Sequence, residues 1–249
     1  MRRWLAVAAL LAAPHLGTAA CTAKQLTPGW LWHYTGIIGE GDRIRLTFTR
    51  TQDAVAGVYF HAGVWKDVRV SGKISGDKNL VLEESGGRFD LEFTEHDPRG
   101  QLPGTLRCQI IAGTWRKEGA KQKLPVYLSL ESGAGGKLDR MYEIAGAKDD
   151  QVVNTNALRF WQAVKRGDKA TVASMVAYPL RLRISGSMTT IHNTQELLKQ
   201  YDTIFTSGFR QTIEADLPRN MFANDRGISL AGGGVWFNAA GRVSMVNPR

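Results

Sequence analysis

The spacing of apolar residues changes near the middle of this chain, and that change limits the folds it can adopt. Between residues 30 and 130, apolar and polar side chains alternate. In DRIRLTFTR (42–50), for example, Ile44, Leu46 and Phe48 share one face. After residue 152 the spacing takes the 3.6-residue period of a helix, as in NTNALRFWQAVKRGD (154–168), and later segments such as YPLRLRISG (178–186) alternate again. The chain is therefore predicted to form two domains of different class.

Short alternating segments separated by turns fill residues 21–131. Seven or eight segments of this kind predict an all-β domain, either an antiparallel barrel or a sandwich. The tripeptide GTW (113–115) resembles a motif of small β-barrels of the lipocalin and avidin kind. Taken alone, its residues indicate a close backbone approach at Gly113 and a core position for Trp115.

Glycine, alanine and charged residues dominate residues 132–151, which we interpret as a linker. A helix is then predicted to start with Asn154 or Thr155 as its cap and to end at Gly167. A further helix is predicted to open at Asn193, with Glu196 at the capping-box spacing. The apolar residues expected on its buried side are Leu197, Leu198, Tyr201, Ile204 and Phe205.

The predicted order of helices and strands in residues 152–249 resembles bacterial nuclear transport factor 2-like domains (SnoaL- and ketosteroid-isomerase-like). The segment 159–180, RFWQAVKRGDKATVASMVAYPL, is similar to their opening, 197–209 to their third helix, and 234–247 to their final hairpin. The resemblance implies an α+β cone with one open mouth. The family includes isomerases and non-catalytic binding modules, so the resemblance leaves the function open.

Residues 1–20 have the order of a secretory signal. A cationic start, Met1-Arg2-Arg3, precedes the apolar run WLAVAALLAAPHL and a group of small residues. We therefore expect cleavage before Cys21 and a periplasmic location. The apolar run is too short to span a membrane as a helix, and no other apolar segment is long enough.

The chain has two cysteines, Cys21 and Cys108. In an oxidising compartment such a pair favours a disulfide, which is our expectation. Lipidation of Cys21 and two free thiols remain open alternatives. A lipoprotein signal usually has a large aliphatic residue at the position that Thr18 occupies here.

The formal net charge is +9, but no run of three or more basic residues occurs. This distribution disfavours nucleic acid as a partner. It is compatible with an acidic partner or an anionic envelope surface.

Motifs that would identify an enzyme or a metal site are missing from the sequence. The histidines show no HxH, HxxxH or HExxH spacing, and there is no GxSxG. Gly232-Gly233-Gly234 precedes a strand-like segment and not a helix, which argues against a phosphate loop. Asp168 fits a helix cap, Asp202 a helix surface, and Asp216 a loop. We therefore predict no catalytic residue, no metal and no cofactor.

Four side chains are the candidate ligand-binding residues of the cone: Tyr178, His192, Tyr201 and Trp236. The function expected is non-catalytic binding of another envelope protein or of a small apolar ligand, with an immunity or inhibitor role as one form of it. An isomerase or dehydratase acting in the cone and a structural component of the envelope are the alternatives. The sheet face that carries Trp236 is also a candidate homodimer surface.

Overall fold

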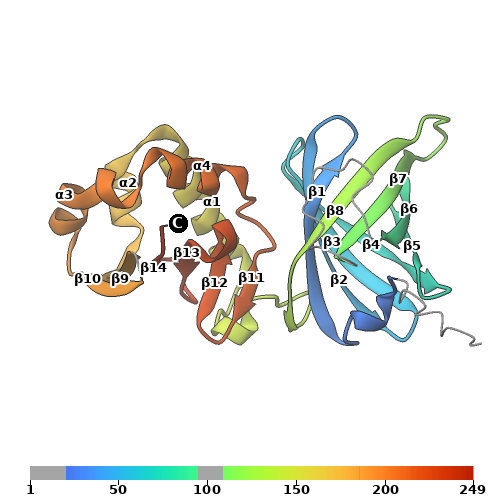
Figure 1. The fold of residues 1–249 in the computed structure, drawn as a ribbon, viewed down its shortest axis with the longest axis horizontal. Helices are drawn as coiled ribbons and strands as arrows, with labels where there is room; N and C mark the ends of the chain where they lie inside the picture. The colour runs from blue at the N-terminus through green and yellow to red at the C-terminus, as the bar shows by residue number, and fades with distance from the viewer. Residues whose placement is uncertain (1–20, 95–108, 185, 249) are drawn as a thin grey trace, which may run out of the picture.

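The computed structural model describes residues 21–94, 109–184 and 186–248. These residues form two bodies that lie side by side along the long axis of the molecule (Figure 1). One is a closed antiparallel barrel of eight strands, and the other is a six-stranded mixed sheet with helices. We name them the barrel, residues 30–135, and the helix–sheet unit, residues 150–246. The barrel confirms the all-β prediction and excludes the sandwich.

Alternation along the strands fills the barrel with apolar side chains. Ile44, Leu46 and Phe48 of β2 are 1% exposed or less, as their spacing predicts. Each strand pairs with the next, and β1 closes the barrel by pairing with β8. The strands are β1 (Trp30–Ile38), β2 (Asp42–Thr51), β3 (Ala54–His61), β4 (Lys66–Ser75), β5 (Asn79–Glu84), β6 (Gly87–Thr94), β7 (Ile110–Lys117) and β8 (Leu124–Gly135). A 3-10 turn, η1 (Ala23–Gln25), precedes them.

The GTW tripeptide lies on β7. A Cβ atom added at Gly113 would lie 2.1 Å from the carbonyl oxygen of Asp90, which confirms the predicted close approach. Trp115 packs against the barrel core but is only half-buried. Its indole Nε1 donates to Glu84 Oε1 over 2.6 Å, which explains why one edge of the ring stays near the surface.

The helix–sheet unit packs one face of its sheet against helices. The strand order is β10-β9-β14-β13-β12-β11; β14 and β9 run parallel, whereas the other neighbours are antiparallel. The helices are α1 (Asp150–Arg166), α2 (Lys169–Ser174), α3 (Thr194–Ile204) and α4 (Ser207–Ala215). The strands are β9 (Val176–Ile184), β10 (Ser187–Ile191), β11 (Phe222–Asn224), β12 (Gly227–Leu230), β13 (Val235–Phe237) and β14 (Val243–Val246), with η3 (Ala231–Gly233) before β13.

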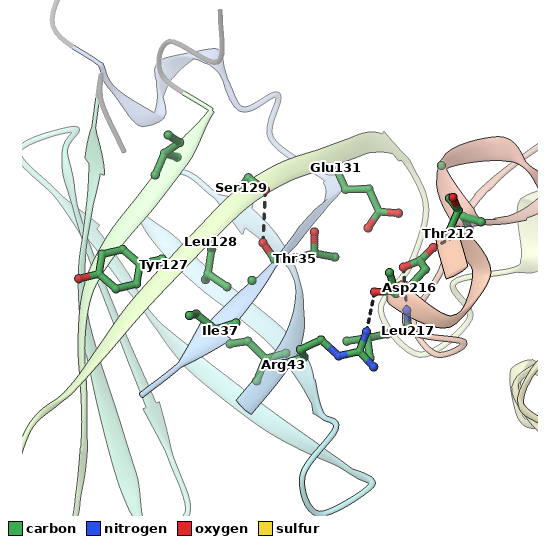
Figure 2. Close-up of a pocket in the computed structure, with 16 residues that line it drawn as sticks. Thr35, Ile37, Arg43, Tyr127, Leu128, Ser129, Glu131, Thr212, Asp216 and Leu217 are labelled. Carbon is green, nitrogen blue, oxygen red and sulfur yellow. Dashed lines mark hydrogen bonds between the residues drawn. The ribbon is translucent and has the colours of Figure 1, made fainter. Parts of the chain in front are cut away.

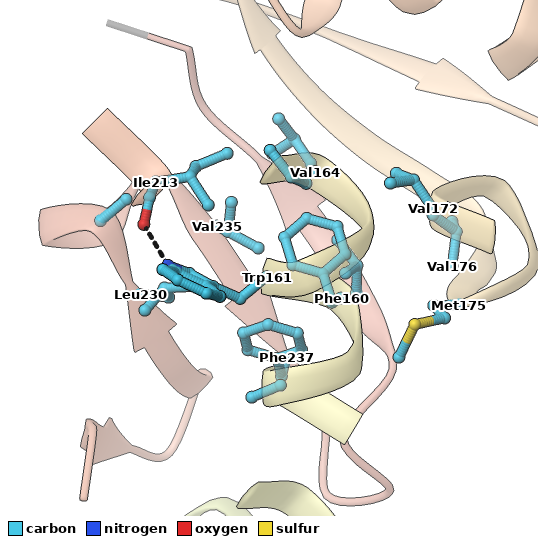
Figure 3. Packing of buried hydrophobic residues seen from close by; sticks show 14 of the residues in the cluster. Phe160, Trp161, Val164, Val172, Met175, Val176, Ile213, Leu230, Val235 and Phe237 are labelled. Carbon is cyan, nitrogen blue, oxygen red and sulfur yellow. Dashed lines mark hydrogen bonds between the residues drawn. The ribbon is translucent and has the colours of Figure 1, made fainter. Parts of the chain in front are cut away.

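Aromatic residues of α1 anchor the core of this unit (Figure 3). The ring of Phe160 meets that of Phe237 edge to face, with centroids 5.5 Å apart. Trp161 is 5% exposed, and its Nε1 donates to the carbonyl oxygen of Ile213 over 3.0 Å. Helix α1 is thereby fixed both to the sheet and to α4.

The predicted start of the first helix is wrong. Helix α1 begins at Asp150, because Asp149 caps it by accepting a hydrogen bond from the Gln151 backbone N–H at 2.7 Å. The Asp150 carboxylate accepts from the backbone N–H groups of Met141 and Tyr142, which fastens the preceding segment to the helix start. The predicted end is confirmed, since Gly167 closes α1 in the left-handed conformation, with φ 67°.

The segment 197–209, expected to form one helix, is divided between α3 and α4. Thr206 interrupts it and caps α4 by accepting from the Phe209 backbone N–H at 3.2 Å. Asn193 caps α3 by accepting from the Glu196 N–H at 3.0 Å, as the capping-box spacing predicts. Leu198 is 39% exposed, so the expectation that it is buried is wrong.

The segment between the two bodies is fastened to the helix–sheet unit. Strand β8 runs to Gly135, and a 3-10 turn, η2 (Glu143–Ala145), follows. Tyr142 is fully buried. Its hydroxyl donates to Asn154 Oδ1 at 2.7 Å and accepts from the Met221 N–H at 3.0 Å. The Tyr142 side chain therefore links this segment to α1 and to the residue that precedes β11.

Some expectations fall on residues outside the described ranges. The signal of residues 1–20 and Cys108 lie there, so cleavage and the Cys21–Cys108 disulfide stay predictions. Cys21 itself is 1% exposed and belongs to the barrel core cluster. Within the described ranges, no helix is both long and apolar enough to cross a membrane.

Candidate functional site

An arginine on the outer wall of the barrel is completely buried between the two bodies. Alternation in β2 turns Arg45 away from the barrel interior, yet the side chain is 0% exposed because the helix–sheet unit covers it. Its guanidinium donates to both carboxylate oxygens of Glu131 on β8, each at 3.1 Å. It also donates to Asp216 Oδ1 at 2.5 Å. Its remaining partners are the carbonyl oxygens of Leu217 and Arg219.

The two carboxylates around Arg45 differ in their surroundings. Asp216, which follows α4, also accepts from the backbone N–H groups of Leu217 and Ala231 at 2.7 and 2.6 Å. Glu131 has Arg45 as its hydrogen-bond donor, and burial raises the pKa of this carboxyl despite the opposing effect of Arg45. Burial alone would lower the pKa of Arg45, but Asp216 and Glu131 outweigh it and hold that pKa above its usual value.

Further polar contacts surround this buried triad. Asp67 on β4 accepts from Arg219 Nε and Nη2 at 2.8 and 2.5 Å, and from Asn220 Nδ2 at 3.0 Å. Arg43 on β2 donates to the carbonyl oxygens of Glu214 and Ala215 at the end of α4. These contacts bind the segment 214–220 to the barrel wall.

A histidine is buried in the same interface. His33 on β1 is 2% exposed, and its Nδ1 lies 3.2 Å from the carbonyl oxygen of Asn220 and 3.0 Å from Thr47 Oγ1. A carbonyl oxygen only accepts, so Nδ1 carries the proton. Burial, followed by the charge of Arg45, lowers the pKa of His33 to about 3. This histidine is therefore neutral at physiological pH.

An open groove runs along the junction beside the triad (Figure 2). We name it the junction groove; its volume is about 520 Å³. One wall is the outside of the barrel and the other is the end of α4 with the start of η3. Most of the lining is apolar, while Glu131 and Asp216 place carboxylates at one end. The apolar lining includes Ile37, Leu128, Ala215, Leu217 and Ala231.

A second groove adjoins the first on the sheet face of the helix–sheet unit. We name it the arginine groove; its volume is about 420 Å³. Cross-strand pairing places Ser229, Trp236 and Met245 in one row, because Trp236 pairs with both neighbours. Arg183 of β9 and Arg226 of the β11–β12 turn also line this groove.

The structure does not bring the four sequence-predicted binding residues together. Tyr201 is fully buried among the helices, whereas Trp236 lines the arginine groove. His192 is exposed before α3, and Tyr178 is half-buried, with its hydroxyl donating to the Ala173 carbonyl oxygen at 3.2 Å. Their role in binding stays a prediction.

The hydroxyl of Tyr201 has no hydrogen-bond partner among the described residues, although its burial would call for one. The ring itself is well packed. It stacks on Phe205 with centroids 4.8 Å apart, and the Lys169 ammonium lies 5.4 Å from its centre. The burial of this ring was predicted from its helical spacing and is confirmed.

Sequence reasoning missed the triad. Alternation gave the correct outward direction for Arg45, but no sequence pattern showed that another body would cover that face. The sequence indicates a loop at Asp216 and places Glu131 at the end of the predicted all-β domain. In the structure all three meet at distances of 2.5–3.1 Å. Arg45 and Glu131 are 86 positions apart in the sequence, and Glu131 and Asp216 are 85 positions apart. At such separations no local sequence pattern indicates that the side chains pair.

Among residues 21–94, 109–184 and 186–248, no cluster of His, Cys, Asp or Glu has an arrangement that could hold a metal ion. Comparison with known protein families, curated proteins and solved structures finds no match for this chain. The two grooves and the triad are therefore interpreted from their own geometry.

Proposed function

We propose that this protein is an exported, non-catalytic binding protein that holds a small apolar or amphipathic molecule in the junction groove. The observation that carries the proposal is the groove itself. A volume of about 520 Å³ lies within the range of about 300–1,000 Å³ that is usual for small-molecule sites. Apolar walls with a few polar groups at one end are also typical of such sites.

The polar groups of the groove favour binding over turnover. A general base must be positioned to take a proton from the substrate, whereas both carboxylates of this groove are oriented by contacts within the protein. The Asp216 carboxylate already accepts three hydrogen bonds, from Arg45, Leu217 and Ala231. Both oxygens of Glu131 are engaged by Arg45. These carboxylates serve to hold the two walls of the groove at a fixed separation.

The export part of the proposal rests on the order of residues 1–20 and on the paired cysteines expected of an oxidising compartment. The nuclear transport factor 2-like assignment of the C-terminal half remains part of the proposal; helices packed on a mixed sheet support it. An envelope protein as partner, including an immunity or inhibitor role, and an isomerase in the cone are the competing functions.

Binding of a neutral fluorescent probe, N-phenyl-1-naphthylamine, to the full chain tests the proposal. Thr212 and Gln211 are adjacent exposed residues of α4, but of the two only Thr212 lines the groove. Thr212→Trp should fill the groove and raise the Kd by about ten-fold, equivalent to ~1.4 kcal/mol. Gln211→Trp is the matched control and should leave the Kd unchanged. Equal affinity in both variants, or no binding to the wild type, would refute the proposal.

A further inference from the structure

We infer that the ligand is an anionic amphiphile, with its apolar part in the junction groove and its anionic head in the arginine groove. The inference rests on the proposed binding function and adds the chemical class of the ligand. Continuity of the two grooves is its first support, because Glu131 and Gly232 line both of them. A single molecule can therefore extend from one groove into the other.

The second support is the difference between the arginines in their hydrogen-bond acceptors. Arg43 and Arg45 at the junction donate to carbonyl and carboxylate oxygens of the protein. By contrast, neither Arg183 nor Arg226 has a carboxylate partner within the described part of the chain. Arg183 donates from Nε to the sulfur of Met188 at 3.4 Å, a weak acceptor. Two guanidinium groups that lie in one groove and have no carboxylate partner among the described residues form a site for a carboxylate or phosphate.

The remaining lining of the arginine groove suits the part of the amphiphile that adjoins its anionic head. Phe222, Trp236 and Met245 supply apolar contact, and the Trp236 indole N–H is already committed to the Gly233 carbonyl oxygen at 2.9 Å. Ser229 and Asn247 add small polar groups beside the arginines. Among the described residues that line the groove, Glu131 is the one acid, and it shares the Arg45 guanidinium with Asp216.

The charge of this lining discriminates between ligand classes. A neutral apolar molecule would occupy the junction groove and leave Arg183 and Arg226 unused. A cationic amphiphile would place its head beside two uncompensated positive charges. An anionic head gains hydrogen bonds in which both the donor and the acceptor are charged, and these are stronger than those that a neutral head would accept.

Displacement of N-phenyl-1-naphthylamine from the full chain by amphiphiles of one chain length tests the inference. The compounds are dodecanol, dodecyltrimethylammonium, dodecanoate and dodecyl phosphate, all below their micelle concentrations. At least one of the two anions should bind about ten-fold more tightly than dodecanol, and the cation should bind no better than dodecanol. A preference for dodecanoate would indicate a free fatty acid, and a preference for dodecyl phosphate a phospholipid-like head.

Substitution of the arginines supplies the second arm. Arg183→Gln and Arg226→Gln should each remove most of the preference for the anion while leaving the probe and dodecanol bound. Arg181→Gln is the matched control, because Arg181 is exposed on the same strand but does not line the groove. It should keep the preference.

The possible failures are distinguishable. Anions that bind no better than dodecanol to a wild type that binds the probe would overturn the inference and leave the proposed function standing. The inference is overturned in the same way if Arg181→Gln abolishes the preference as fully as the other two variants. Absence of probe binding would remove the proposed function and this inference together.

Discussion

Arg45 of the barrel donates to Asp216 of the helix–sheet unit over 2.5 Å, and the arginine side chain is 0% exposed. The pair joins two bodies whose sheets are separate. Removing the Asp216 carboxylate deprives the buried Arg45 of a charge-assisted hydrogen bond and leaves Glu131 as its one carboxylate partner among the described residues, which is costly. The two residues therefore give a direct measure of how strongly the bodies are coupled.

Removing the charge of Asp216 should destabilise the protein. We expect Asp216→Asn to lower the free energy of unfolding by about 2 kcal/mol, since Arg45 stays buried and loses one of its two carboxylate partners. Urea unfolding followed by fluorescence gives this value. Asp202→Asn is the control, because Asp202 pairs with Lys169 at the surface and its side chain is 74% exposed. A loss no greater than that of the control would show that the buried pair does not couple the bodies.

The buried histidine should make the protein sensitive to acid. His33 has a pKa of about 3 when folded, against an ordinary value of 6.5, so the unfolded chain binds one more proton between these pH values. The contribution of neutral, buried His33 to the free energy of unfolding is therefore fully present above pH 6.5. It is lost as the pH falls toward 3, by about 1.4 kcal/mol per pH unit. The difference in unfolding free energy between the wild type and His33→Gln, measured from pH 7 to about 4, should shrink with that slope. A constant difference would contradict the burial of a neutral His33.

Removing the side chain of Ala231 should relieve backbone strain at this position. Its φ of 56° lies in the left-handed region, which costs a non-glycine residue roughly 1 kcal/mol. Ala231→Gly should therefore leave stability unchanged or raise it by up to ~1 kcal/mol. Ala223→Gly in β11 is the control, because it removes an equally buried methyl group at a position without positive φ, and it should destabilise. Equal losses in calorimetry for both would argue against strain at Ala231.

Processing of the chain start provides the test of location. We expect the protein from its native host to begin at Cys21, with Arg2 and Arg3 removed, and to carry a Cys21–Cys108 disulfide. Non-reducing mass spectrometry should show no free thiol and no diacylglycerol. An acylated Cys21 would make the protein a lipoprotein, and an intact Met1 would remove the export proposal.

Local patterns predicted much of the fold, but not the junction. Alternation in β2 placed Ile44, Leu46 and Phe48 inside the barrel, and the spacing of Asn193 and Glu196 placed the start of α3. Both depend on residues close in sequence. The start of α1 was missed although its signal is local, because Asp149 caps the helix by accepting from the Gln151 backbone N–H. Asp150 adds contacts to the backbone of Met141 and Tyr142, which no periodicity of the sequence indicates.

The candidate site failed to emerge for a related reason. An outward-facing arginine on a strand, such as Arg45, is ordinarily solvated. Whether a second body covers it depends on how the two complete surfaces fit together, which no local pattern of residues indicates. Trp236 was singled out from sequence, and it does line a groove. Its neighbours there, Arg183 and Arg226, come from other strands and turns, and their convergence depends on the strand order β9-β14-β13-β12.

Closure of the barrel through the pairing of β1 with β8 leaves it no free strand edge. The helix–sheet unit consequently cannot be joined to it by extending one continuous sheet, and side chains such as Arg45 and Asp67 carry the attachment instead. Side-chain attachments tolerate small rotations that a shared hydrogen-bond ladder would forbid. The width of the space between the bodies is thus set by a few side chains, so substitutions at these positions would change which molecules fit there without altering either sheet.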